Sequence, residues 1–97
     1  MNREQDIQLT FNEIVRACDG DADWVVNVIE EEIISVQGSP REAGFSGWQL
    51  ARIRRARRIS RDFEASVPAT ALILQLLDEL ETMRKGRLED SNRALPL

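Results

Sequence analysis

A stripe of apolar residues near the C-terminus constrains the fold of this chain more than any other feature. The stripe recurs at the spacing of one helix face and covers an arc of roughly 140°. Its members are Ala69, Leu72, Ile73, Leu76, Leu77, Leu80 and Met83. Ser66 and Pro68 favour a helix start, while Lys85 and Gly86 favour a helix end. We therefore predict a long C-terminal helix over residues 66–85 and a flexible tail over 86–97.

The chain is too short to cover this stripe easily by itself. It has 97 residues, enough for a single domain over 1–97, and a domain of this size buries only about two-thirds of the surface of its unfolded chain. The first interpretation is a homodimer in which the helix packs against a second copy. The alternative is that the helix completes an intramolecular core. The predicted dimerisation residues are Leu72, Ile73, Leu76, Leu77, Leu80 and Met83.

Two short helices are predicted before residue 34. Thr10 and Glu13 form a capping-box pattern, and Gly20 ends the first helix. Asp21 or Asp23 caps the second, whose apolar side is Ala22, Val25, Val26, Ile29 and Ile33. The opposite side carries Trp24, Asn27, Glu30 and Glu31. Two short helices joined by a glycine-containing turn predict a helix-turn-helix.

A small β wing and a third helix are predicted to follow. Ile34 and Val36 alternate, and Phe45 supplies a returning strand of a small irregular hairpin. Ser46 and Gln49 form a second capping box at the start of the third helix. The apolar stripe of that helix is Leu50, Ile53, Ala56, Ile59 and Phe63. The predicted fold class is mainly α, with a winged helix-turn-helix over residues 7–64 and the long C-terminal helix after it.

The third helix is rich in arginine. Six arginines lie within residues 51–61 of a chain whose net charge is −4. They form a solvated outer face, or pair with acidic residues such as Asp62 and Glu64 or with a partner subunit, or bind phosphate. Direct nucleic-acid binding is the least favoured of the three, because no aromatic residues interleave with the arginines and the chain is acidic.

Composition argues against an enzyme with a metal or a cofactor. The chain has no histidine and a single cysteine, Cys18, so zinc, haem and Cys/His nucleophile chemistry are not expected. The first ten residues are polar, unlike a signal peptide. The longest apolar run, Ala71 to Leu77 with Gln75 inside it, is far below the roughly 18 residues of a membrane span. We expect a soluble cytoplasmic protein without cofactors.

The order of elements resembles MerR-type winged helix-turn-helix domains, and residues 58–84 resemble the chaperone modulator (CbpM-type) family. The family carries an Arg-Leu-x-x-Asp-Leu segment and a later run ending in Leu-Leu-Asp-x-Ile-x-x-Leu. The segment "NVIEEEIISVQG" also resembles the family, although Glu32 and Ala69 stand where glycine is usual or common. The matching residues are Arg58, Ile59, Asp62, Phe63, Ala69, Leu76, Leu77, Asp78, Leu80 and Met83.

The resemblance implies a regulator that is not an enzyme. Members bind the J-domain of a CbpA-type (DnaJ-like) co-chaperone, keep it from the DnaK-type chaperone, and can oppose its DNA binding. The alternative function is a MerR-like DNA-binding transcription regulator. A third interpretation is a scaffold with some other protein partner.

Two candidate surfaces for a J-domain follow from the pattern of charges. The second helix carries Glu30 and Glu31 with Glu32 beside them and no lysine or arginine, so it should repel DNA. The resemblance implies a J-domain partner, and J-domains are known to present a basic helix. Acidic faces of this chain would complement that helix. We rank Leu74, Asp78 and Glu81 first, where Leu74 is either an exposed anchor or buried. The second candidate is Trp24, Asn27 and Glu31.

Overall fold

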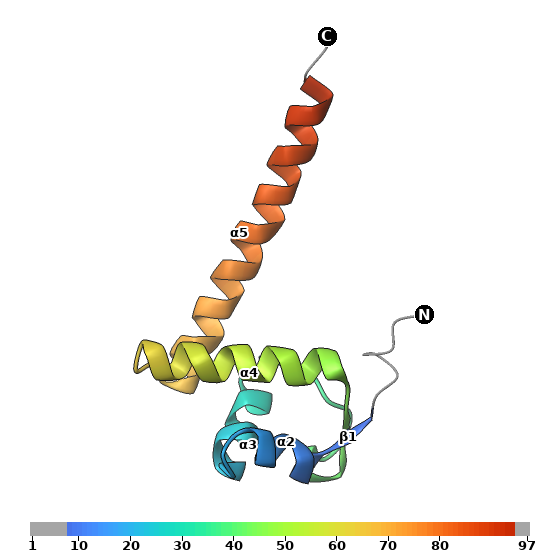
Figure 1. Cartoon of the computed structure of the whole chain (residues 1–97), viewed down its shortest axis with the longest axis vertical. Coiled ribbons are helices and arrows are strands. Elements are labelled where there is room, and N and C mark those ends of the chain that lie inside the picture. The colour runs from blue at the N-terminus through green and yellow to red at the C-terminus, as the bar shows by residue number, and fades with distance from the viewer. Residues whose placement is uncertain (1–7, 95–97) are drawn as a thin grey trace.

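The computed structural model describes residues 8–94, with side chains described for residues 8–87. The helices are α2 (Phe11–Ala17), α3 (Ala22–Glu30), α4 (Gly47–Asp62) and α5 (Val67–Ala94), with a short 3₁₀ helix, η1, at Pro40–Glu42. The strands are β1 (Leu9–Thr10) and β2 (Gly44–Phe45). Figure 1 shows α2 and α3 beneath α4, with α5 rising from them. The predicted mainly α organisation, with a small β element and a long C-terminal helix, is confirmed.

Helix starts follow the local capping patterns of the sequence. The N–H of Glu13 donates to Thr10 Oγ1 at 3.1 Å, and the N–H of Thr10 donates to Glu13 Oε1 at 2.9 Å. The bond from the Thr10 N–H, followed by the one from its hydroxyl, holds the pKa of the Glu13 carboxyl below its usual value. Asp21, rather than Asp23, caps α3 by accepting from the Trp24 N–H at 3.0 Å.

The two-stranded sheet differs from the predicted hairpin. β1 pairs antiparallel with β2, with Leu9 opposite Phe45 and Thr10 opposite Gly44, so the strand predicted at Ile34 and Val36 is wrong. The connection after α3 uses its carbonyls differently. Arg52 Nε donates to the Ile33 carbonyl at 2.6 Å and Gln49 Nε2 donates to the Ser35 carbonyl at 2.7 Å. Side chains of α4 thus satisfy acceptors that a strand would offer to a ladder.

The core lies between the α2–α3 pair and the two longer helices. Phe11 and Phe45 pack with ring centroids 6.5 Å apart. Phe63, predicted to continue the apolar stripe of α4, is 70% exposed because α4 ends before it and Phe63 is the C-cap residue. The buried apolar residues are Phe11, Ile14, Cys18, Val25, Val28, Ile33, Ile34, Phe45, Ile53, Ala56, Ile59, Val67 and Leu74.

The C-terminal helix is longer than predicted. Its end was expected at Lys85 and Gly86, with a tail over 86–97, yet α5 continues to Ala94. One glycine costs a helix only about 1 kcal/mol, which flanking helix formers such as Arg84 and Arg87 offset. Residues 95–97 lie outside the described part. In Figure 1 the C-terminal half of α5 extends away from the domain.

The apolar stripe of α5 is divided between two sides of the helix. Val67, Thr70 and Leu74 are buried, and Ala71, Ile73 and Leu77 pack at the edge of the core. Four large apolar residues of the stripe point away from the domain, at about 160° to 240° around the helix from Leu74. These four, named here the outer stripe, are Leu72, Leu76, Leu80 and Met83, with exposed fractions of 50% to 62%.

Candidate partner-binding surfaces

An acidic groove lies between the end of α3 and the start of α5. Asn27, Glu30 and Glu31 are exposed on one side, and Pro68 and the buried Val67 lie on the other, with Ser66 completing the lining. The hollow measures about 360 Å³. In the part of the chain with described side chains, neither lysine nor arginine lines it, and α3 carries neither. The groove therefore offers two carboxylates beside an apolar patch, and we call it the acidic groove.

Trp24, the third candidate on α3, lies apart from the acidic groove. The guanidinium of Arg57 sits 4.8 Å from the centre of the Trp24 ring. The same guanidinium lies 3.6 Å from a carboxylate oxygen of Asp21 and 3.9 Å from one of Asp19. These contacts attach α4 to the turn before α3. Trp24 is thus already engaged by its own chain, whereas Asn27 and Glu31 remain together.

The surface ranked first from the sequence is not present as predicted. Leu74 is 0% exposed, so the exposed-anchor interpretation of this residue is wrong. It faces inwards because α5 packs on the domain along Val67, Thr70 and Leu74, to one side of the widest part of the apolar arc. Leu74 therefore does not provide the exposed anchor that was predicted beside Asp78 and Glu81.

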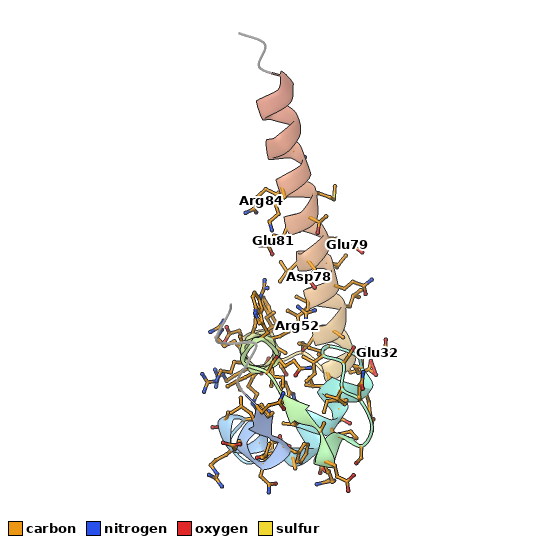
Figure 2. The ribbon with its side chains drawn as sticks, turned by 90° about the vertical axis from the view of Figure 1, so that its right-hand side faces the viewer. Glu32, Arg52, Asp78, Glu79, Glu81 and Arg84 are labelled. Atoms are coloured by element: carbon orange, nitrogen blue, oxygen red, sulfur yellow. The ribbon has the colours of Figure 1, made fainter. Side chains whose placement is uncertain are left out.

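Asp78 is paired, and Glu81 is free of the domain. Arg52 Nη2 donates to Asp78 Oδ2 at 2.9 Å, in an ion pair between α4 and α5. Figure 2 shows Arg52 beneath Asp78, with Glu81 and Arg84 farther along α5. Both side chains of the pair are partly exposed, so the contribution to stability is at most about 1 kcal/mol. Asp78 is less available to a partner than its sequence position suggests.

The arginines of α4 fall into two groups. Arg52 and Arg57 pair with Asp78, Asp19 and Asp21, and neither Asp62 nor Glu64 forms the ion pairs expected from the sequence. The other four have no carboxylate within ion-pair distance in the described part of the chain: Arg54, Arg55, Arg58 and Arg61. Intramolecular pairing thus accounts for one group, and a solvated face for the other.

Sequence reasoning missed Trp48. Its side chain is 57% exposed and lines a hollow of about 420 Å³ at the start of α4. Ile34 and Ser35 form one wall, and Ala51, Arg52 and Arg55 continue the wall that Trp48 begins. The signal was present in the spacing, because Trp48 falls about 140° around the helix from the buried Ile53. We call this hollow the Trp48 groove.

The described residues show no arrangement suited to metal binding. No group of three His, Cys, Asp or Glu side chains among them is placed to hold a metal ion. Burial raises the pKa of the Cys18 thiol, which keeps it in the neutral form that reacts slowly. Among residues 8–94, none of the helices combines the length and the apolar character that crossing a membrane requires.

Comparison with known proteins gives a consistent result. Residues 9–89 match the family described as MerR HTH family regulatory protein. The chain is 29% identical over 79 residues to the chaperone modulatory protein CbpM of Pseudomonas entomophila (strain L48), covering 80% of this chain and 78% of that protein. It is 30% identical, with the same coverage, to the chaperone modulatory protein CbpM of Pseudomonas putida (strain W619). No solved structure matches the chain significantly.

Proposed function

Since the chain belongs to the MerR HTH family, and within it to the CbpM-type chaperone modulatory proteins, we propose that it binds and inhibits a J-domain co-chaperone. Its partner is a co-chaperone of the CbpA/DnaJ type. Binding occupies the J-domain, so that the co-chaperone no longer engages its DnaK-type chaperone, and opposes its DNA binding. The relatives are named as modulatory and regulatory proteins, which fits a role without catalysis.

The acidic groove is the single observation that supports this proposal best. A J-domain presents a basic helix, and the groove sets Glu30 and Glu31 beside the apolar side chains of Val67 and Pro68. Carboxylates would steer the basic helix towards the groove, and the apolar patch would supply contact area. The α3 side is therefore our first candidate for the J-domain site, and Asp78 with Glu81 on α5 is the second.

The same surface disfavours the alternative, a DNA-binding regulator. In a helix-turn-helix that reads DNA, the second helix enters the major groove between two phosphate backbones. Here that helix is α3, which ends in Glu30 followed by Glu31 and Glu32 and carries no cation. Repulsion of phosphates by this end of the helix opposes binding. The observation that supports the DNA-binding alternative is the description of the matching family as a regulatory protein.

A homodimer through α5 completes the proposal. The outer stripe leaves three leucines and a methionine at least half exposed on a helix that extends beyond its domain. A second copy of the same stripe would cover it, in the manner of a coiled-coil seam. The intramolecular alternative accounts for the inner side of α5 and leaves the outer stripe uncovered.

Calorimetric titration of a purified CbpA-type J-domain tests the proposed function and its site. The wild type should bind, and Glu31→Lys should weaken the affinity about tenfold or more, because it places a cation against a basic helix. Glu81→Lys makes the same charge change on α5 and should leave the affinity within about twofold. Because of the acidic groove, we also expect the protein not to bind a duplex DNA fragment at low salt.

Three outcomes contradict parts of the proposal. A wild type that does not bind the J-domain overturns the function. Tight duplex binding that weakens steeply with salt supports the DNA-binding alternative instead. Weakening by Glu81→Lys without an effect of Glu31→Lys moves the site to α5.

A further inference from the structure

The Trp48 groove shares none of its lining residues with the acidic groove and lies at the start of α4. One of its lining residues, Arg52, also pairs with Asp78 of α5 (Figure 2). None of the interactions described for the J-domain requires it. The groove is therefore a separate feature of the surface, and a ligand there would not occupy the proposed J-domain site.

The walls of the Trp48 groove are fixed by hydrogen bonds. Gln49 Oε1 accepts from the Ser46 N–H at 2.9 Å, while its Nε2 donates to the Ser35 carbonyl at 2.7 Å. Arg52 Nε donates to the Ile33 carbonyl at 2.6 Å. Two side chains of α4 thus hold the opposite wall in place. A preformed groove lowers the ordering cost that a ligand would otherwise have to overcome.

The lining of the groove is mostly apolar, and it includes an exposed aromatic ring. Ile34, which is buried, lines it together with the small side chain of Ala51 and the exposed ring of Trp48. Tryptophan and arginine are the residue types most enriched among side chains that dominate binding energies. The size of the hollow, about 420 Å³, suits one or two large apolar side chains.

The charge around the Trp48 groove is positive. Among residues 8–87, no carboxylate lines it, and the two charged side chains that do are Arg52 and Arg55. Arg52 is neutralised by Asp78, whereas Arg55 has no ion-pair partner in the described part of the chain. Arg54 and Arg58 extend the same unpaired charge along the outer face of α4. The sign is opposite to that of the acidic groove.

We infer that the Trp48 groove docks an acidic peptide segment of a partner protein, anchored by an apolar side chain against Trp48 and Ala51. Carboxylates of that segment pair with Arg55 and are attracted by Arg54 and Arg58. Nucleic acid fits less well, because the wall at Ile34 is apolar and offers a phosphate backbone no charged partner. The segment differs from the basic helix of a J-domain, so the protein has two docking surfaces of opposite charge.

Trp48 fluorescence provides a direct test. In the full chain carrying Trp24→Phe, the emission reports on Trp48 alone, since these are the two tryptophans of the chain. The probe is an amphipathic peptide of glutamate, leucine and phenylalanine about 12 residues long, and the matched control peptide has lysine at every glutamate position. The acidic peptide should shift the emission to shorter wavelengths as the indole leaves water, and the lysine peptide should not.

A pair of charge reversals locates the contact. Arg55→Glu should weaken binding of the acidic peptide about tenfold. Arg61→Glu makes the same change in net charge about 9 Å farther along α4, beyond the Debye length of about 8 Å at physiological salt, and should change affinity less than about threefold. Arg55→Glu should leave J-domain titration unchanged, which separates this inference from the proposed function.

Four results would overturn the inference. They are no emission shift with the acidic peptide, equal binding by Arg55→Glu and the wild type, and tighter binding of a single-stranded oligodeoxythymidylate than of the peptide. The fourth is an emission shift that follows the protein's own concentration without peptide, which would identify a second copy of the chain as the occupant.

Discussion

Glu32 occupies a backbone conformation that favours glycine. Its φ is 60°, one residue beyond the C-cap of α3, where the N–H of Glu32 bonds to the Ile29 carbonyl and that of Ile33 bonds to the Val28 carbonyl. This is a Schellman motif, whose left-handed residue is usually glycine. Asp19 and Glu64 adopt the same geometry after α2 and α4, with φ of 58° and 50°. The resemblance had already marked Glu32 as a departure, and its φ explains why glycine is usual there.

Replacing Glu32 with glycine should therefore stabilise the protein. Glu32→Gly removes a strain of about 1 to 2 kcal/mol, part of which is offset by the greater freedom of glycine in the unfolded chain. We expect the free energy of unfolding, measured by urea denaturation, to rise by about 1 kcal/mol. Glu32→Ala, which removes the charge and keeps Cβ, should change it by less than about 0.5 kcal/mol. Equal or lower stability of Glu32→Gly would contradict this explanation.

Residues whose role is local were predictable from the sequence. The capping pairs Thr10–Glu13 and Ser46–Gln49 are present because donor and acceptor lie three positions apart on the same chain. Leu74 was not predictable to the same degree. Its burial depends on which side of α5 meets the domain, and helical periodicity alone cannot decide between two sides of a wide apolar arc.

At the scale of elements, α5 differs most from what its sequence predicts. One side, through Leu74 and Leu77, completes the core, while the outer stripe remains uncovered. The intramolecular interpretation holds for the inner side of α5, and the dimer stays a prediction for the outer stripe, because periodicity finds an apolar face but not the surface that covers it. The wrong strand prediction has a similar origin. The apolar Ile34 is buried in the core without being part of a strand, and the carbonyls of its neighbours Ile33 and Ser35 accept hydrogen bonds from Arg52 and Gln49.

The outer stripe leads to a prediction about oligomeric state. We expect the wild type to sediment as a dimer at micromolar concentration and Leu76→Glu as a monomer. A leucine that becomes fully buried contributes roughly 1 to 3 kcal/mol, whereas a buried carboxylate without a partner is costly. Gln75→Glu, at an exposed neighbouring position, is the matched control and should remain dimeric.

Circular dichroism controls for folding. The helices of the domain should be retained in Leu76→Glu, because half of the Leu76 side chain is already exposed. Any loss of helix content should be confined to the part of α5 that extends beyond the domain. A wild type that sediments as a monomer at micromolar concentration would show that the stripe has another occupant.

At the scale of the whole molecule, charge is distributed by element. Acidic groups gather at the end of α3 and at residues 78–81 of α5, and unpaired arginines gather on the outer face of α4. The net charge of −4 hides this separation. Composition therefore predicted weak affinity for nucleic acids in general but not the presence of two surfaces of opposite sign. That distinction requires the fold, because the ion pairs of Arg52 and Arg57 decide which arginines remain free.

The proposed inhibition of a co-chaperone is tested most directly by ATP hydrolysis. A DnaK-type chaperone is mixed with a CbpA-type co-chaperone at a concentration that stimulates its ATPase, and the chain is added in increasing amounts. We predict that the stimulated rate falls to the chaperone's basal rate as the chain saturates the J-domain, and that Glu31→Lys requires about tenfold more protein for the same effect. A stimulated rate that is unchanged when the chain is in large excess over the co-chaperone would contradict the account.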